Sequence, residues 1–168
     1  QGLQELQTMS LKIYGDTVYI GTKAGIYFSA DWGQTWSELA TILRAKSIYS
    51  IDCYSDYIIA GSRNSTIMIS TDRGLTWSNS VLPFGWFDLD ITDVKAIKSK
   101  TGLYLLAGTQ HISTLNDADI HQLGRGVFMS DDMGISWYDA NLGLPDYLGV
   151  ISIERAANYT FVAMNSIG

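Results

Sequence analysis

An eight-residue pattern occurs three times in this chain and constrains its fold more than any other feature. "SADWGQTW" occupies residues 29–36, "STDRGLTW" residues 70–77 and "SDDMGISW" residues 130–137. Each copy, called an octet below, has Ser first, Asp third, Gly fifth and Trp last. Recurrence of this kind within one chain indicates a repeat architecture, in which every copy marks the same point of one structural unit.

The sequence around the octets repeats as well. A strand-like segment that ends in small residues precedes each octet, and a second such segment runs directly into it. The first unit shows the pair as "VYIGT" (18–22) and "GIYFS" (25–29). The pair recurs at 58–62 with 66–70 and at 105–109 with 126–130. After residue 145 the cycle begins again. Each unit therefore predicts the order strand, turn, strand, short loop, strand, octet, strand.

This order predicts an all-β chain. Four short strands repeated every ~40 residues are the signature of a β-propeller blade, a four-stranded antiparallel sheet. The predicted units are 3–40, 41–82, 83–145 and an incomplete 146–168, which makes about three and a half blades. Propellers close on themselves, so we expect a fragment of a larger propeller of about six to eight blades. The remaining blades of the same chain, or a partner subunit, would close the ring.

The residue types of the octet fit one sharp turn between two strands. An Asp carboxylate can accept hydrogen bonds from backbone N–H groups of its own turn. Glycine supplies a position with φ above zero, and a Ser hydroxyl can tie the start of the turn to its end. The tryptophan begins the outer strand, where we expect its ring to lie between neighbouring blades. The octet residues with these predicted structural roles are Ser29, Asp31, Gly33, Trp36, Ser70, Asp72, Gly74, Trp77, Ser130, Asp132, Gly134 and Trp137.

The pattern S-x-D-x-G-x-[TS]-W resembles the Asp-box, also called the BNR repeat. This repeat is found in sialidases, sortilin-type receptors, xyloglucan-cleaving hydrolases, photosystem assembly factors and many secreted or surface bacterial proteins. The three matches and their strand context cover nearly the whole chain. In those families the box lies away from the catalytic face. The resemblance therefore implies that Asp31, Asp72 and Asp132 are scaffold residues rather than catalytic or metal-binding ones.

Composition excludes several function classes. The net charge is −6 and no run of Lys or Arg exists, so we expect no nucleic-acid partner. The apolar stretches are far shorter than a membrane-spanning helix requires. Cys53 is the only cysteine, which excludes an internal disulfide; in the strand-like segment "SIDCYSDYIIAG" it is expected to be a small core residue.

Two insertions distinguish the third unit and predict a binding face. They are "PFGWFDLDITD" (83–93) and "QHISTLNDADIHQLGR" (110–125). In an up-and-down blade both connections emerge on one face, opposite the octets, and long loops on a rigid scaffold often bind ligands. The candidate binding residues on this face are Trp86, Phe87, Asp88, Asp90, His111, Asn116, Asp117, Asp119 and His121.

The chemistry of these loops leaves alternatives open. Alternating oxygen ligands at 116–119 hint at calcium, but the remainder of an EF-type pattern is missing, which favours a solvated acidic turn. His111 and His121 are ten residues apart, unlike the i, i+4 pair of a helical zinc site, which favours two surface histidines. Trp86 with Phe87 could form an aromatic platform for a sugar or protein, or cap the core. We predict no metal site and no cofactor.

Two function classes remain. The favoured one is a non-catalytic binding or scaffold module of an exported or cell-surface protein that recognises a protein or glycan through the loop-rich face. The segment "NLGLP" (141–145) resembles long extracellular bacterial propellers, which favours the binding and scaffold readings together. The alternative is part of a sialidase- or xyloglucanase-like glycoside hydrolase whose catalytic residues lie mostly outside this chain. Sialidases use three arginines and an Arg-Ile-Pro stretch; none of the five arginines here precedes Ile-Pro, so no catalytic residue is assigned.

Overall fold

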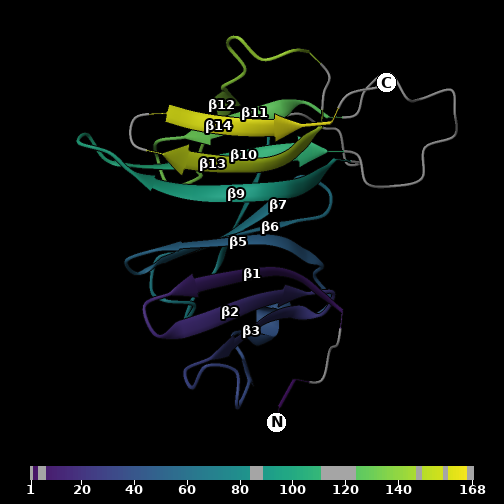
Figure 1. The fold of residues 1–168 in the computed structure, drawn as a ribbon, viewed down its shortest axis with the longest axis vertical. Coiled ribbons are helices and arrows are strands. Elements are labelled where there is room, and N and C mark those ends of the chain that lie inside the picture. Colours follow the sequence, from purple (N-terminus) through teal and green to yellow (C-terminus); the bar gives the residue numbers. More distant parts are fainter. Residues whose placement is uncertain are drawn as a thin grey trace, which may run out of the picture.

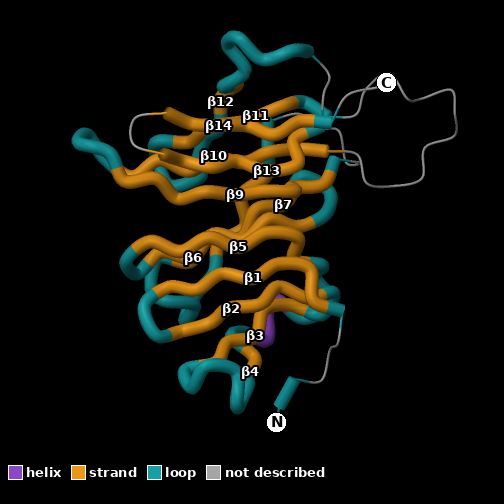
Figure 2. Tube along the Cα trace, in the orientation of Figure 1, coloured by secondary structure: helices purple, strands orange, loops and turns teal. Residues whose placement is uncertain are grey.

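The computed structural model describes residues 2–3, 7–83, 89–110, 124–146, 149–156 and 159–165. The predicted all-β class is confirmed. These residues form three four-stranded antiparallel sheets and one two-stranded sheet. The first three follow one another along the long axis of the molecule, and the two-stranded sheet overlaps the third in this view (Figures 1 and 2). Within every sheet, strands that follow one another in the chain are neighbours, which is the up-and-down order that the repeat predicts.

The strand bounds repeat from sheet to sheet. The first sheet holds β1 (Thr8–Tyr14), β2 (Thr17–Thr22), β3 (Gly25–Ser29) and β4 (Ser37–Glu38), followed by the short 3₁₀ helix η1 (Thr41–Leu43). The second holds β5 (Ile48–Tyr54), β6 (Tyr57–Ser62), β7 (Thr66–Ser70) and β8 (Ser78–Val81). The third holds β9 (Asp90–Lys98), β10 (Leu103–Gln110), β11 (Gly126–Ser130) and β12 (Tyr138–Asp139), and the fourth β13 (Val150–Ala156) and β14 (Tyr159–Met164).

Antiparallel pairing gives the stack two distinct ends. The octets lie at the same end as the turns that join the first and second strands of each sheet. The Arg73 N–H, inside the second octet, donates to the carbonyl of Asp56 in the β5–β6 turn at 2.8 Å. At the opposite end, which we call the insertion end, the Ser65 N–H donates to the carbonyl of Leu89 at 2.7 Å. The described residues that flank both insertions lie at the insertion end.

Apolar clusters between the sheets hold the stack together. Ile59 and Ile67 of the second sheet share one buried cluster with Val94 and Phe128 of the third. Equivalent clusters join the first sheet to the second and the third to the fourth. Because a neighbouring sheet covers each of its faces, β6 is buried over five of its six residues instead of alternating buried with exposed. Burial of both faces is what turns separate sheets into one folded unit.

A glycine near the end of the second strand of the first three sheets lets the next sheet approach closely. A Cβ added to Gly61 would lie 2.6 Å from Cγ2 of Ile91, and one added to Gly108 would lie 2.5 Å from Cγ1 of Val150. Gly21 faces Ile48 in the same way. Both distances are far below van der Waals contact, so any side chain here would push the sheets apart. The small residues that end "VYIGT", "IIAGS" and "LLAGT" therefore have a packing cause.

Each octet forms the hydrogen-bonded turn that its residue types predict. In the third copy the Gly134 N–H donates to Ser130 Oγ at 2.8 Å, and Ser130 Oγ donates to Asp132 Oδ1 at 2.8 Å. The Ser136 N–H donates to Asp132 Oδ1 at 2.9 Å. Met133 has φ 64° and Gly134 φ 82°, so two left-handed residues make the turn. The first and second octets contain the same bonds. The scaffold role of the octets stays a prediction, for which tests are given below.

The three octet tryptophans differ in their surroundings. Each lies one residue before the outer strand. The ring of Trp77 packs against the cluster between the first two sheets, and Trp137 is buried between the second and third. Trp137 Nε1 donates to Ser80 Oγ of the preceding sheet at 2.7 Å. Trp36 lines a hollow of its own sheet. No described sheet precedes the first one, so the expectation that this ring lies between two blades stays a prediction.

The octet aspartates predict a dependence of stability on pH. Hydrogen bonds from the side chain and backbone of Thr35 lower the pKa of Asp31 to about 2, and those from Ser136 lower the pKa of Asp132 to about 2. In the unfolded chain an aspartate titrates near ~3.9. The folded pKa is lower, so this contribution is complete above the unfolded pKa and is lost as the pH falls through the folded pKa. We expect Tm to fall steeply from about pH 4 to about pH 2.

Asp132→Asn tests this assignment. The amide cannot titrate, so Tm measured by circular dichroism from pH 6 downward should be lower at neutral pH and should change less with acid. Asp16→Asn is the matched control, because Asp16 is exposed in the β1–β2 turn and makes no hydrogen bond among the described residues. Equal pH profiles for the two variants would contradict the role given to Asp132.

Candidate functional site

Of the candidate binding residues predicted from the insertions, only Asp90 lies within the described part of the chain. Asp90 begins β9, is 3% exposed, and pairs with Nε of Arg63 at 3.7 Å. These contacts place Asp90 inside the fold rather than on an exposed rim. The other candidates lie outside the described residues: Trp86, Phe87, Asp88, His111, Asn116, Asp117, Asp119 and His121.

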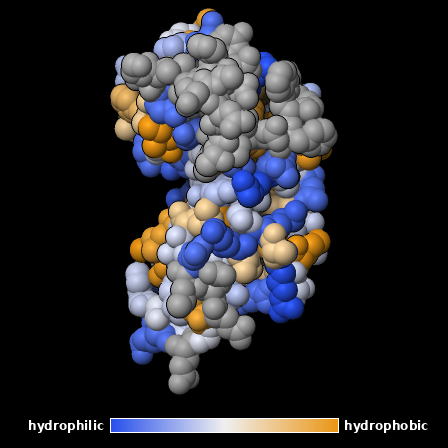
Figure 3. All heavy atoms as spheres, turned by 90° about the vertical axis from the view of Figure 1, so that its right-hand side faces the viewer, coloured by the Kyte–Doolittle hydropathy of each residue, from blue (hydrophilic) through white to orange (hydrophobic). Residues whose placement is uncertain are grey.

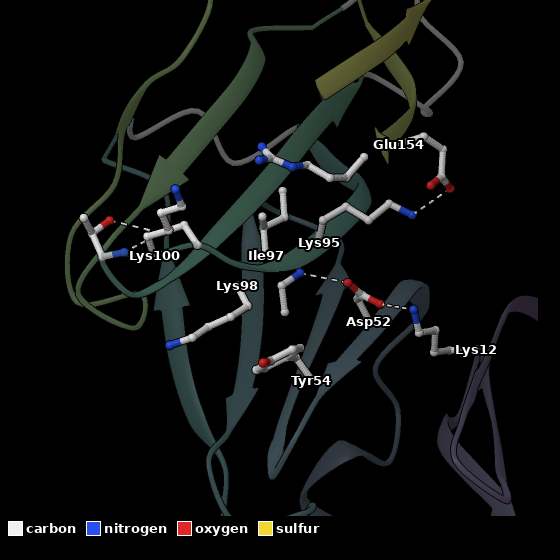
Figure 4. Close-up of a pocket in the computed structure, with 12 residues that line it drawn as sticks. Lys12, Asp52, Tyr54, Lys95, Ile97, Lys98, Lys100 and Glu154 are labelled. Atoms are coloured by element: carbon white, nitrogen blue, oxygen red, sulfur yellow. Dashed lines mark hydrogen bonds and ion pairs between the residues drawn. The ribbon is translucent and has the colours of Figure 1, made fainter. Parts of the chain in front are cut away.

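The structure directs attention to a different surface, formed by the first strand of each sheet. Figure 3 shows that the molecule is a crescent with a hollow on one side. A cleft of about 920 Å³ opens there, and a second hollow of about 380 Å³ shares three of its lining residues. We call this surface the inner-strand cleft. Its lining is Lys12, Asp52, Tyr54, Lys95, Ala96, Ile97, Lys98, Ser99, Lys100, Thr101, Glu154 and Arg155 (Figure 4).

One register position carries charge of alternating sign along the cleft. It is occupied by Lys12 in β1, Asp52 in β5, Lys95 in β9 and Glu154 in β13, each one residue beyond an apolar residue. Lys12 forms an ion pair with Oδ1 of Asp52, whose Oδ2 accepts a hydrogen bond from the Ala96 N–H at 2.8 Å. Lys95 Nζ donates to Glu154 Oε1 at 3.1 Å (Figure 4).

The pair formed by Lys95 and Glu154 favours the charged form of both groups. Partial burial by itself lowers the pKa of Lys95, but the nearby carboxylates of Asp93 and Glu154 outweigh it, so the pKa is raised. The hydrogen bond and charge of Lys95 lower the pKa of Glu154. Both side chains therefore stay ionised at neutral pH, which makes Glu154 a poor proton donor.

Positive charge is in excess in this cleft although the protein is acidic. Five basic and two acidic side chains line it, in a chain whose net charge is −6. Lys98 and Lys100 stand at the end of β9 and in the turn that follows, at the octet end (Figure 4). Among the described residues neither lysine nor Arg155 takes part in an ion pair. These three cations leave a local field that attracts an anionic ligand.

Beneath the cleft, one buried carboxylate joins three sheets. Asp93 is 8% exposed, and its Oδ1 accepts from Ser50 Oγ of the second sheet at 2.8 Å. Its Oδ2 accepts from the Ile153 N–H of the fourth sheet at 2.6 Å and lies 3.7 Å from Lys95 Nζ. The carboxylate fixes the spacing of β5, β9 and β13, and so holds the cleft walls in place.

Other chemistry finds little support in the described part of the chain. No group of three or more His, Cys, Asp or Glu side chains comes together there as potential metal ligands. Cys53 is 6% exposed, and burial raises the pKa of its thiol to about 12, as expected of an inert core cysteine. No helix in the described ranges is long and apolar enough to cross a membrane.

The cleft was not predicted from the sequence, although a signal for it exists. When the four units are aligned on their first strands, Lys12, Asp52, Lys95 and Glu154 occupy the same alignment position. This position has meaning only when the strand pairing is known, because a shift of one residue moves every side chain to the other face. The two insertions, which are visible without register, drew the prediction to the opposite end.

Comparisons with known proteins support the fold. No protein-family model and no curated protein matches the chain. A structure of YCF48 bound to D1 peptide matches with a TM-score of 0.58 and 15% identity, over 82% of this chain and 42% of that chain. An ancestral GH74 enzyme matches with a TM-score of 0.55 and 13% identity, over 99% of this chain and 30% of that one. The chain spans less than half the length of either protein.

A designed protein gives a match of similar quality. The computationally designed Ika4 protein matches with a TM-score of 0.59 and 14% identity, over 100% of this chain and 95% of that chain. At such low identity these similarities show the fold and nothing about activity. Together with the observed sheets, they define the chain as an array of β-propeller blades.

Proposed function

We propose that this chain is a non-catalytic binding module of the Asp-box propeller type, within an exported or cell-surface protein. Its inner-strand cleft binds an acidic, extended segment of a protein partner. The observation that carries the proposal is the positive charge of the cleft in a protein of net charge −6. The loop-rich insertion end is a second surface of the same module, for a protein or glycan.

The cleft suits an extended peptide with carboxylate side chains. Its cations project from several strands, so successive carboxylates of one segment could each meet a charge. Lys98 and Lys100 are exposed and need little rearrangement to pair with a ligand. A structure of YCF48 bound to D1 peptide supports peptide binding by this fold.

The glycosidase alternative has less support. The fold match to a GH74 enzyme is consistent with it, but a retaining or inverting glycosidase needs a carboxyl group whose pKa is raised. Lys95 shifts the pKa of Glu154 in the opposite direction. We expect assays for sialidase and endoglucanase activity on the parent protein to be negative.

Fluorescence anisotropy with a fluorescein-labelled hexaglutamate peptide tests the proposal. The wild-type chain should bind it, and added salt should weaken binding because exposed charges are screened. Lys98→Glu/Lys100→Glu should lower the affinity by about tenfold or more. Each substitution replaces an attraction with a repulsion at the mouth of the cleft.

The matched control is Lys23→Glu/Lys46→Glu. It changes the net charge equally. Lys23 lies in the β2–β3 turn, and the backbone carbonyl of Lys46 accepts a hydrogen bond from the Gly25 N–H, so both residues lie at the insertion end. This variant should bind the peptide with nearly wild-type affinity. Absence of binding by the wild type, or an equal loss in both double variants, would refute the cleft as the site.

A further inference from the structure

The first strand of every sheet is an edge strand that lies along the inner-strand cleft. In an antiparallel ladder, alternate residues of such a strand direct both the backbone N–H and the C=O away from the sheet, where a further strand can pair with them. Strand β9 lies inside the stack: Val94 packs in the cluster shared with the second sheet, and Ile97 packs against the cluster shared with the fourth. Its free edge therefore does not arise at either end of the stack.

Side chains of the second sheet close two outward positions on the edge of β9. The Val94 N–H donates to Ser50 Oγ at 3.1 Å, and the Ala96 N–H donates to Asp52 Oδ2 at 2.8 Å (Figure 4). Both N–H groups thus point away from β10. Because the direction alternates along a strand, the N–H and C=O of Lys98 point away from β10 as well.

The backbone groups at Lys98 are open among the described residues. The Ser99 N–H points the other way and donates to the carbonyl of Gly102 at 2.8 Å, as the alternation requires. Within the described ranges, no hydrogen bond is made by the Lys98 N–H or by the outward carbonyls of Ala96 and Lys98. Lys98 is exposed at the mouth of the cleft. One donor and two acceptors of the backbone therefore face the cleft.

The equivalent position of the second sheet is closed. When the first strands are aligned, Ser55 occupies the position of Lys98. The Ser55 N–H donates to the hydroxyl of Tyr14, a residue of the preceding sheet, at 2.7 Å. The counterpart of Tyr14 in the second sheet is Tyr54, which lines the cleft but makes no hydrogen bond to the Lys98 N–H (Figure 4). The edge of β9 is therefore open where the edge of the second sheet is capped.

We propose that the acidic segment binds as an added β-strand on the octet end of β9; this inference rests on the proposed function. A carbonyl of the segment accepts from the Lys98 N–H, and N–H groups of the segment donate to the carbonyls of Ala96 and Lys98. Main-chain pairing of this kind holds a peptide extended. Its carboxylates then meet the ammonium groups of Lys98 and Lys100, which stand at the same end of the cleft.

The charges at this edge select the strand that can pair with it. A second copy of the same edge would bring its own lysines, and like charges opposite one another repel. An acidic strand replaces this repulsion with attraction. The side chain of Lys98 lies on the same face of β9 as those of Val94 and Ala96, because side chains alternate along a strand. The occupant is therefore an extended acidic segment with a carboxylate directly opposite Lys98.

Lys98→Pro and Lys98→Ala separate the backbone N–H from the charge. Both variants lack the ammonium group, but only proline also lacks the outward N–H. Proline is compatible with an edge strand when its nitrogen points away from the ladder. In fluorescence anisotropy, Lys98→Pro should bind labelled hexaglutamate about tenfold more weakly than Lys98→Ala does. Circular dichroism and the urea midpoint should show that both variants are folded.

Two further measurements use the wild-type chain. Hexaglutamate that is N-methylated at every internal amide keeps its carboxylates but has no N–H donors there, so it should bind about tenfold more weakly than hexaglutamate. Hydrogen exchange followed by NMR reads the edge directly. At a peptide concentration of about ten times Kd, exchange of the Lys98 amide should slow by about tenfold. The Ser55 amide, already bonded to Tyr14, should exchange as before.

The outcomes distinguish this inference from the proposed function. If hexaglutamate does not bind the wild-type chain, the proposed function fails and strand addition fails with it. If hexaglutamate binds but its N-methylated form binds equally well, charge alone holds the segment in the cleft and strand addition is overturned. An unprotected Lys98 amide in the complex, or equal affinities of Lys98→Pro and Lys98→Ala, overturns it in the same way and leaves the cleft as the binding site.

Discussion

Replacing Trp137 with alanine should destabilise the protein by about 3–5 kcal/mol, the cost of emptying a buried aromatic site. The ring of Trp137 is 6% exposed and lies in the cluster that joins the second and third sheets. Its Nε1 also donates to Ser80 Oγ, a group that the variant leaves without this partner. A domain is stable by about 5–15 kcal/mol, so this loss should be visible as a large fall in the urea midpoint.

The repeat supplies a matched control for this substitution. Trp36 occupies the same octet position, but it is half-buried against its own sheet, and its Nε1 donates to the Gly33 carbonyl of its own octet at 3.1 Å. Trp36→Ala should cost clearly less than Trp137→Ala. Equal losses would mean that the tryptophan acts within its own hairpin and that the contact between sheets matters little.

Replacing Asp93 with asparagine should lower the free energy of unfolding by about 2–4 kcal/mol. The substitution turns one carboxylate oxygen into an NH₂ group, which then faces the hydrogen-bond donors that the oxygen accepted from. Oδ1 accepts from Ser50 Oγ and from the Val94 N–H, and Oδ2 accepts from the Ile153 N–H. Whichever oxygen becomes NH₂, a buried donor loses its acceptor. The variant is nearly isosteric, so lost packing does not explain the effect.

Asp146→Asn is the control for Asp93→Asn, since Asp146 is exposed in the segment before the fourth sheet. It should unfold at the wild-type urea concentration. The two aspartates therefore separate the effect of a buried bridging carboxylate from that of a change in net charge. An Asp93→Asn variant as stable as Asp146→Asn would remove Asp93 from its role in spacing β5, β9 and β13.

Local patterns predicted the fold because the octet combines several local signals. The Ser, Asp and Gly of residues 130–134 specify one turn through bonds within a few residues, so the turn can be inferred without knowing the rest of the structure. Gly108 is recognised in the sequence as a small residue at the end of a strand. The reason that a glycine is needed there is the close approach of Val150, a contact between segments far apart in the sequence. Such contacts follow only after the sheets are placed.

The candidate site was predictable to a smaller extent. Asp90 was assigned to an exposed loop because it lies within an insertion, whereas the structure starts β9 at this residue and buries it beside Arg63. The inner-strand cleft depends on the register of four strands, and its charges come from residues as far apart as Lys12 and Glu154. No single segment of the sequence contains that pattern.

The central claim is that the octet tryptophans Trp77 and Trp137 fix their sheets to the preceding ones. A nuclear Overhauser experiment on the indole N–H of Trp137 tests it most directly. We predict a cross-peak to the β protons of Ser80, a residue 57 positions away in sequence that accepts this N–H at 2.7 Å. An indole N–H that shows cross-peaks only to residues 130–137 would contradict the account.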